Sequence, residues 1–189
     1  MKQPFKMDIE AIRRRARDKM YDGAVTDAYR ADREQVIAVL NEALATEIVC
    51  VLRYTQHYMM ATGAHSGPAR AEFLEHAQQE QAHMMQIAER ITQLGGSPNF
   101  DPQGLATRSH AQYAEGATLE EMIKEDLVAE RIAIETYSEI IRWLGDDDPV
   151  THRLMKDILA TEEEHADDLL DLLGDGEKEV SPTPSSHEH

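Results

Sequence analysis

The chain carries one spaced pattern of glutamate and histidine twice. In each copy a lone glutamate precedes a Glu-x-x-His motif, by 33 residues in the first copy and by 32 in the second. The members of the two copies are Glu47, Glu80 and His83, then Glu130, Glu162 and His165. A tyrosine follows each lone glutamate by seven residues, as Tyr54 and Tyr137. The duplication favours a fold of two similar halves that bring four carboxylates and two imidazoles to one place.

Four long segments have the periodicity of amphipathic helices, and each lies between residues typical of helix ends. They cover about 33–62, 66–94, 118–144 and 148–173. Thr118-x-x-Glu121 predicts a capping box, and Asp148 before Pro149 predicts a helix start. Glycines predict the four helix ends, at Gly63, Gly95, Gly145 and Gly174.

The connections predict how these helices pair. Short turns join the first helix to the second and the third to the fourth, so each pair is expected to form an antiparallel hairpin. Residues 97–117 are long enough, at roughly 3.3 Å per residue, to run the length of the bundle and leave the second and third helices parallel. The predicted fold is all-α, a four-helix bundle of two antiparallel hairpins joined by a long crossover over residues 33–174. Residues 1–32 are expected to form a basic arm, with a helix as one option, and residues 175–189 a disordered polar tail.

The glutamates and histidines of the repeat lie in phase with the apolar faces of the helices. In the second segment, Glu80 and His83 continue a stripe formed by Phe73, Ala77 and Ile87, and the other segments have the same arrangement. Counted from the two hairpin turns, all six residues lie 15 to 18 positions away, which is within about one helical turn of a common level. They are therefore expected to meet in the core.

Buried carboxylates need compensation. Four ionised carboxylates in a dry core cost several kcal/mol each unless they are paired. Two divalent cations balance the four negative charges, and the neutral imidazoles add ligands without adding charge. Carboxylate and imidazole without thiolate favour iron or manganese, with zinc as a third choice. The pattern thus predicts a centre of two metal ions.

The order of these motifs resembles that of the ferritin-like di-iron carboxylate proteins, and most closely that of bacterioferritin. In that group one glutamate comes from each of two helices and a Glu-x-x-His motif from each of the others. The resemblance implies that Glu47 and His83 are terminal ligands of one iron, that Glu130 and His165 serve the other, and that Glu80 and Glu162 bridge them. It also implies ferroxidase activity, in which two Fe(II) ions are oxidised by O2 or H2O2 for iron storage or detoxification.

Two departures from bacterioferritin affect this expectation. The methionine that ligates haem in bacterioferritins is replaced here by Gln81, so no haem is predicted. Residues 174–189 are polar and contain Gly and Pro, and therefore do not resemble the fifth helix of 24-subunit cages. A homo-oligomer that is a dimer or a smaller shell is expected instead.

The charge and the cysteine content restrict partners and location. The formal net charge of −17 argues against general binding to nucleic acid or anionic membranes and suits a protein that attracts cations. The single Cys50 excludes an internal disulfide and fits a reducing compartment. No signal peptide is evident in residues 1–17, and no segment is predicted to cross a membrane, so a cytoplasmic protein is expected.

Several alternatives stay open at this point. The same centre would serve a rubrerythrin-like or di-manganese peroxide-reducing enzyme, and a non-enzymatic DNA-protecting shell is a third hypothesis. The basic residues 13–17 are interpreted as part of an arm that packs on the bundle or on a partner subunit, rather than as a nucleic-acid arm. Tyr54 and Tyr137 are either hydrogen-bond donors to ligands, redox-active, or ordinary core residues. Asp126 is interpreted as a surface acid in preference to an orienting residue, and Cys50 as a packing residue.

Overall fold

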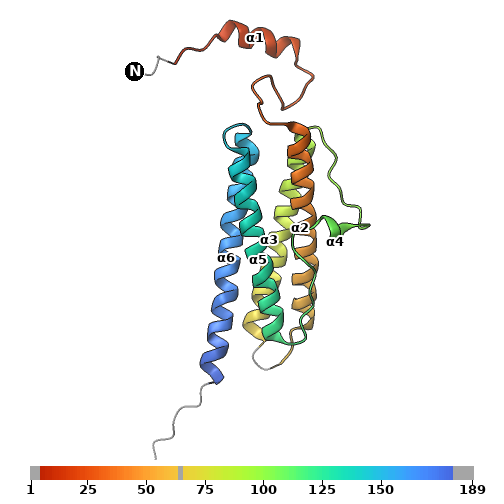
Figure 1. Ribbon diagram of the computed structural model, residues 1–189, viewed down its shortest axis with the longest axis vertical. Helices are drawn as coiled ribbons and strands as arrows, with labels where there is room; N and C mark the ends of the chain where they lie inside the picture. The colour runs from red at the N-terminus through yellow and green to blue at the C-terminus, as the bar shows by residue number, and fades with distance from the viewer. Residues whose placement is uncertain (1–4, 64–65, 181–189) are drawn as a thin grey trace, which may run out of the picture.

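The computed structural model describes residues 5–63 and 66–180, with side chains to residue 174. This part of the chain contains six helices: α1 (Ile9–Asp18), α2 (Arg33–Met60), α3 (Gly67–Gln93), α4 (Leu105–Arg108), α5 (Leu119–Leu144) and α6 (Pro149–Val180). Four of them, α2, α3, α5 and α6, lie side by side as an elongated bundle, and α1 lies beyond one end of it (Figure 1).

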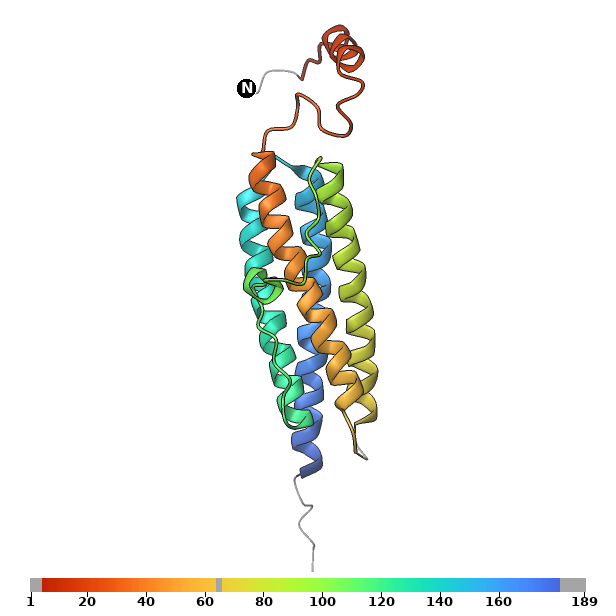
Figure 2. The same cartoon turned by 90° about the vertical axis from the view of Figure 1, so that its right-hand side faces the viewer.

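The bundle consists of two antiparallel hairpins. Helix α2 packs against α3, and α5 packs against α6, while contacts of α3 with α6 and of α2 with α5 join the two hairpins. The second view shows the crossover and its short helix α4 on the outside of the bundle, so that α3 and α5 run in the same direction (Figure 2). The predicted all-α bundle of two hairpins and a long crossover is confirmed.

Side chains of α2 hold the crossover along the bundle. Asn41 accepts a hydrogen bond from the backbone amide of Asn99 (2.7 Å), and Thr46 accepts one from the backbone amide of His110 (3.0 Å). Arg53 donates to the carbonyl oxygen of Gln112 (3.1 Å), and His57 Nε2 lies 3.1 Å from the carbonyl oxygen of Ala114. The crossover partners advance in the same order as the α2 residues. The long connection therefore runs parallel to α2, and its backbone groups find partners that a free loop would lack.

Most of the predicted helix ends are present. Thr118 and Glu121 form the expected capping box of α5. Asp148 accepts from the amide of Thr151 at 2.9 Å, as a helix-capping side chain does. Gly145 ends α5 with a φ of 48°, a conformation that glycine adopts without strain.

The predicted end of the fourth helix at Gly174 is wrong. Helix α6 continues for six residues beyond it, to Val180. Gly174 does not have a positive φ, and apart from its chain neighbours and the backbone of its own helix no atom lies within 4 Å of the position of a Cβ there. A glycine inside a helix costs only about 1 kcal/mol relative to alanine, and the residues that follow include good helix formers. The part of the predicted disordered tail at residues 181–189 lies outside the described residues.

Most of the apolar core lies in two clusters, and a third, small one joins Cys50 to the crossover residue Ala111 and to Ala129. One cluster contains Leu40, Leu44, Ile91 and Ile158, and the other contains Phe73, Ile123 and Leu169. On each bundle helix a glutamate of the repeat lies between the residues that contribute to the two clusters. The six residues of the repeat are thus enclosed by apolar packing on both sides along the bundle axis.

Within the described residues one helix, α2, is long and apolar enough to cross a membrane by length and composition. The prediction that no segment is long and apolar enough to cross a membrane is therefore wrong. Helix α2 packs against α3, α5 and the crossover, and half of its most apolar window is buried inside the bundle. Its buried face also carries Glu47, Arg53 and His57, so α2 is a core helix of a soluble bundle.

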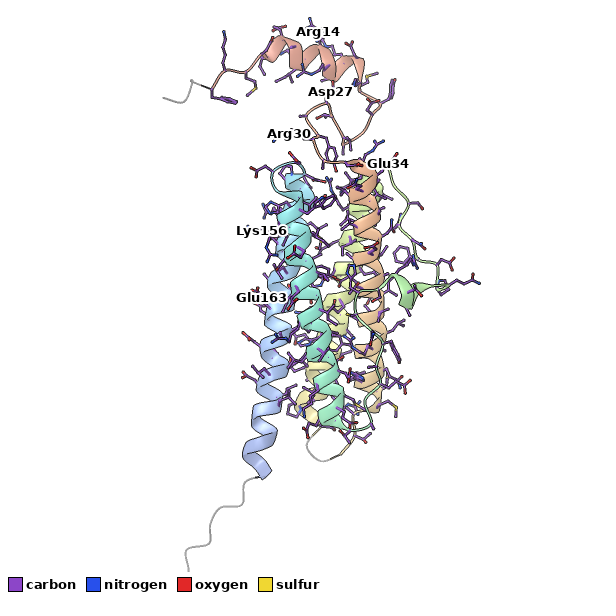
Figure 3. The ribbon with its side chains drawn as sticks, viewed as in Figure 1. Arg14, Asp27, Arg30, Glu34, Lys156 and Glu163 are labelled. Atoms are coloured by element: carbon purple, nitrogen blue, oxygen red, sulfur yellow. The ribbon has the colours of Figure 1, made fainter. Side chains whose placement is uncertain are left out.

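The basic arm contains a helix, as one option predicted. No residue of α1 is buried, and Arg14 points away from the bundle (Figure 3). The expected packing of the arm on the bundle is thus absent from the single chain. The segment that follows is attached to the turn between α5 and α6, because Tyr29 donates to Asp148 at 3.0 Å and Arg30 pairs with Asp147 at 3.5 Å.

Candidate metal centre

The structure brings all six residues of the repeat together inside the bundle. Each of them is at most 6% exposed. Their ligand atoms form two groups of four residues, in which all atoms lie within 4.8 Å of one another. The groups are Glu47, Glu80, His83 and Glu162, and Glu80, Glu130, Glu162 and His165. Glu80 and Glu162 belong to both groups, which is the arrangement expected of bridging ligands.

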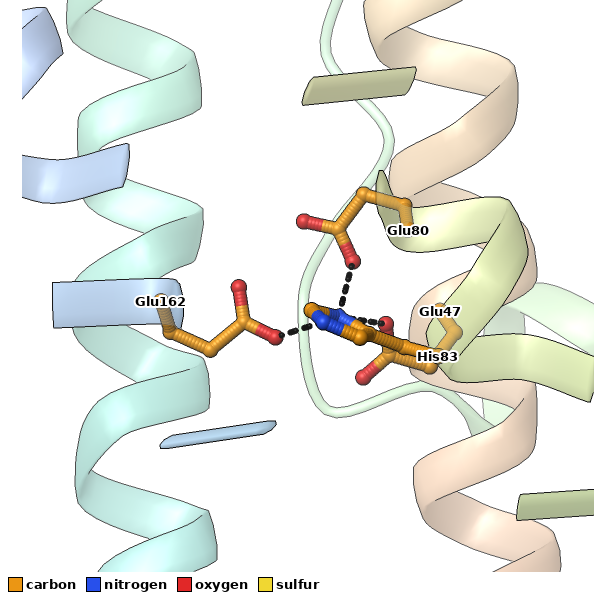
Figure 4. Close-up of side chains that lie close together, drawn as sticks. All are labelled: Glu47, Glu80, His83 and Glu162. Carbon is orange, nitrogen blue, oxygen red and sulfur yellow. Dashed lines mark ion pairs between the residues drawn. The ribbon is translucent and has the colours of Figure 1, made fainter. Parts of the chain in front are cut away.

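The first group is centred on the Nδ1 atom of His83. This atom lies 3.1 Å from Glu162 Oε1, 3.5 Å from Glu47 Oε2 and 3.6 Å from Glu80 Oε2. The three carboxylates come from three different helices and point at one ring nitrogen (Figure 4).

The second group has the same form around the Nδ1 atom of His165. This atom lies 3.3 Å from Glu80 Oε1, 3.3 Å from Glu162 Oε2 and 3.8 Å from Glu130 Oε2. Each of the two shared glutamates therefore directs one oxygen to His83 and the other to His165. A carboxylate in that position is able to join two cations.

The two tyrosines of the repeat bond the lone glutamates of the opposite hairpins. Tyr54 on α2 donates to Glu130 Oε1 on α5, and Tyr137 on α5 donates to Glu47 Oε1 on α2. Both hydroxyls are fully buried. Of the three hypotheses for these tyrosines, the structure places them as hydrogen-bond donors to the candidate ligands. Each donor leaves the other oxygen of its glutamate directed at the centre.

His165 has two further neighbours that the sequence did not point to. Gln79 Oε1 lies 2.6 Å from His165 Nε2 and accepts a hydrogen bond from it, while Nδ1 faces the centre. The ring of His76 stacks on that of His165, with 3.9 Å between centroids. Burial and the nearby imidazole of His165 lower the pKa of His76 to about 4, so the His76 ring is neutral at pH 7.

Without cations, the buried carboxyl and imidazole groups of the centre have strongly shifted pKa values. Burial opposes the charged form of His83 and of His165, but the surrounding carboxylates outweigh it and raise the pKa of each imidazole to about 12. Burial and the charges of Glu47 and Glu130 raise the pKa of Glu162 to about 7. Burial also raises the pKa of Glu47 well above its ordinary value, with a further contribution from Glu80.

Two divalent cations fit this set of donors. Seven oxygen and nitrogen atoms of the six residues are buried and have no hydrogen-bond partner. They include both oxygens of Glu162 and the Nδ1 atoms of His83 and His165. Buried polar atoms without partners are rare in folded proteins, and these all face one small volume. Four carboxylates, two imidazoles and no thiolate suit iron or manganese.

A second buried polar cluster lies beside the centre. Asp126 is fully buried and lies 2.7 Å from both Arg53 Nε and His57 Nδ1. The interpretation of Asp126 as a surface acid is therefore wrong. It orients a histidine, but one that holds the crossover and does not belong to the centre. The four-residue spacing of Arg53 and His57 on one helix face was the signal that the sequence offered.

Cys50 is buried, as expected for a packing residue, and lies 3.6 Å from Arg53 Nη2. Burial raises the pKa of its thiol well above the ordinary value. A neutral, buried thiol of this kind is a poor metal ligand.

Comparison with known proteins agrees with this geometry. A model of the ferritin-like domain matches residues 37–178, which cover the four bundle helices except for the first residues of α2 and the last residues of α6. The chain belongs to the ferritin-like family.

Its relatives include proteins of two kinds. The DNA protection during starvation protein of Pyrococcus furiosus is 34% identical over 138 residues, which are 71% of this chain and 74% of that protein. The bacterioferritin of Desulfovibrio desulfuricans is 30% identical over 138 residues, 72% of this chain and 73% of that protein. The resemblance to bacterioferritin is thereby confirmed at the level of the family.

Solved structures share the same fold. The bacterioferritin-related protein from Bacteroides fragilis, described as a dodecameric thioferritin, has a TM-score of 0.76 and 32% identity, and the match covers 79% of this chain and 90% of that one. Dps from Thermosynechococcus elongatus has a TM-score of 0.73 at 24% identity, covering 78% of this chain and 96% of that one, and shows likeness of fold.

Proposed function

We propose that the protein is a ferroxidase, which binds two Fe(II) ions between its hairpins and oxidises them for iron storage or detoxification. The observation that carries the proposal is the pair of shared glutamates. Glu80 and Glu162 each direct one oxygen to each histidine, in the manner of ligands that join two metals. Membership of the ferritin-like family supports iron as the metal, and manganese fits the same donors.

The chain would hold the ions and control what surrounds them. Glu47 and His83 would be terminal ligands of one ion, and Glu130 and His165 of the other. Bound Fe(II) supplies the electrons: two ions give up one each, and O2 with two protons becomes H2O2, or H2O2 with two protons becomes two waters. Tyr54 and Tyr137 fix the terminal carboxylates through their hydroxyl groups. The apolar clusters on either side keep bulk water from the centre.

An oligomer of this chain would complete the storage function. The dodecameric relative favours a closed shell of moderate size, which agrees with the expectation of a dimer or a smaller shell in place of a 24-subunit cage. The acidic chain, with a net charge of −17, would give such a shell a surface that attracts Fe(II). Cys50 as a free buried thiol fits a cytoplasmic location.

Anaerobic Fe(II) followed by a pulse of O2 tests the proposal. We expect O2 consumption at two Fe(II) per chain, and further growth of ferric absorbance when more Fe(II) is added. Rapid turnover of peroxide with an external reductant and little retained iron would instead favour the peroxide-reducing alternative. The absence of both activities in protein shown to bind two metal ions would contradict the proposal.

A DNA-protecting shell is the second candidate. The P. furiosus relative bears that name, and the arginines of α1 lie exposed on an arm beyond the bundle. Residues 1–33 have nine basic and six acidic side chains, although the whole chain is strongly acidic. A gel mobility shift with linear duplex DNA decides, since a DNA-binding arm requires a shift that disappears when residues 1–32 are removed.

A further inference from the structure

His76 is a buried histidine with one ring nitrogen that has no partner. The residue is 1% exposed, and its Nε2 atom is among the buried atoms without a hydrogen bond. That atom lies 3.6 Å from Glu72 Oε2 and 3.6 Å from Asp168 Oδ2. Both distances are too long for hydrogen bonds. A buried nitrogen thus faces two carboxylates without bonding either.

The hydrogen bonds around Tyr54 determine which nitrogen of His76 carries the proton. The Tyr54 hydroxyl has one proton, and it is donated to Glu130. His76 Nδ1 lies 3.2 Å from the same hydroxyl oxygen, so Nδ1 must be the donor of that bond. A neutral ring with its proton on Nδ1 has a lone pair on Nε2. Three acceptors, one nitrogen and two carboxylates, then face one point.

The spacing of these three acceptors fits a small cation. Their ligand atoms lie within 4.8 Å of one another. Ligands at about 2.1 Å from a tetrahedral zinc or similar ion lie roughly 3.4 Å apart, close to the 3.6 Å that separates Nε2 from each carboxylate. One imidazole with two carboxylates is a donor set used by divalent transition metals.

We propose that Glu72, His76 and Asp168 form a third metal site, which binds a single divalent transition-metal cation at the seam between α3 and α6. The site is separate from the inner centre and shares no ligand with it. It is open on one side, since the side chains of Glu72 and Asp168 are 34% and 53% exposed, whereas His76 is enclosed. Water molecules would complete the coordination there.

The outer site lies next to the inner centre, where it would supply that centre with cations. His76 stacks on His165, so the outer cation would wait one ring away from a ligand of the inner centre. Two carboxylates at the surface concentrate cations at that point and thereby speed their entry. This role rests on the proposed ferroxidase function, whereas the binding of a cation does not.

Equilibrium dialysis with Zn(II), which undergoes no redox reaction, tests the binding. The Glu72→Gln/Asp168→Asn variant should bind one zinc ion fewer per chain than the wild type. The Glu75→Gln/Asp167→Asn variant is the matched control, because it removes the same charge from exposed neighbours on the same helices. Anomalous scattering from zinc-soaked crystals should show an ion about 2.0–2.1 Å from His76 Nε2. Equal zinc content in all three proteins, or no ion at His76, would overturn the proposal.

A variant without the two bridging glutamates separates this proposal from the ferroxidase proposal. Glu80→Ala/Glu162→Ala protein should retain the zinc ion at His76, and its loss there would show that the outer group is not a site of its own. Retention of that ion supports the site even if the wild type does not oxidise Fe(II).

If the wild type oxidises Fe(II), the Glu72→Gln/Asp168→Asn variant should do so about tenfold more slowly at limiting iron, with the same final amplitude. An unchanged rate would contradict the supply role.

Discussion

On the His165 side of the centre, the imidazole ring is held by Gln79 and stacked on His76, whereas the residues that the structure describes provide no such support for the ring of His83. The two Glu-x-x-His motifs are 82 residues apart, so the counterparts of Gln79 and His76 in the other hairpin are Thr161 and Ile158. Neither supplies a hydrogen bond to a ligand ring. The six candidate ligands and the tyrosines that bond the two lone glutamates are duplicated, but the groups around the two histidine rings are not.

The same asymmetry extends along the bundle. Arg53, His57 and Asp126 form a buried polar cluster at one end. The residues at the equivalent positions of the repeat are Thr136, Ile140 and Ala43, and the last two belong to the apolar core. The cluster of Arg53, His57 and Asp126 and its link to the crossover therefore occur at one end only, and the other end has a different buried pair, Arg90 with Asp148, beside its apolar core. Symmetry is retained for the six candidate ligands and for the two tyrosines that bond the lone glutamates.

Removal of the bridges should have the largest effect, because it acts on both halves at once. In Glu80→Ala and Glu162→Ala, one oxygen is lost from each of the two metal positions. Loss of a residue that only orients a ligand costs 10- to 100-fold in metal affinity, so loss of a bridge should cost at least about 100-fold. Elemental analysis and the initial rate of Fe(II) oxidation measure this. Glu163→Ala is the control, since Glu163 lies on the outer face of α6 (Figure 3). Unchanged kinetics in both bridge variants would contradict the assignment.

Disruption of the polar cluster should have the largest effect on stability. Asp126→Ala leaves the buried Arg53 guanidinium without its carboxylate. Breaking a buried ion pair in this way costs about 3–5 kcal/mol, which lowers the midpoint of thermal unfolding by roughly 10 °C in a chain of this size. Glu125→Ala, at an exposed position beside it, should change stability by less than about 0.5 kcal/mol. Equal midpoints for the two variants would show that the cluster does not hold the bundle and crossover together.

Support of the ligand rings should differ between the two hairpins. Gln79→Leu removes the acceptor for His165 Nε2 and should weaken the metal at His165 about 10- to 100-fold. Thr161→Val, at the equivalent position, should leave the metal at His83 nearly unaffected. Titration of each variant with Mn(II), followed by electron paramagnetic resonance, measures the two affinities. Similar losses in both variants would refute the asymmetry.

Proton release should be similar in the two halves, and its effect on affinity is the smallest of the four. The pKa of His83 and that of His165 are raised to about 12 without metal, so both rings are charged at pH 7. A cation at Nδ1 must displace that proton, and Glu47 and Glu162, whose pKa values are raised, lose protons as well, so binding releases at least two protons per chain and strengthens as the pH rises. A pH indicator in weakly buffered Zn(II) titrations measures the release. Binding without released protons would show that the rings are neutral beforehand.

The convergence of the six candidate ligands and the topology of the bundle could be predicted from the sequence, because both depend on local periodicity. Apolar residues spaced three and four positions apart predicted that Glu80 and His83 lie on the buried face of their helix. The capping residues Thr118 and Asp148 predicted where two helices begin. The length of the crossover determined the order of the hairpins.

The surroundings of the centre were not accessible, because they depend on partners far apart in the chain. Aspartate is usually found at protein surfaces. Asp126 is buried because it pairs with Arg53, which lies 73 positions away in the sequence. His76 and Gln79 lie on the same helix as Glu80, but their importance comes from His165 on α6. The end of α6 was misplaced because Gly174 is tolerated within a helix at modest cost.

Anomalous scattering at the iron edge, from crystals grown anaerobically with Fe(II), shows directly whether two metal ions bind between the hairpins. We expect two iron ions about 3.5–4 Å apart, one at His83 Nδ1 and one at His165 Nδ1, with Glu80 and Glu162 in contact with both. No iron between the hairpins, or a single ion that leaves one of the two histidines without metal at saturating Fe(II), would contradict it.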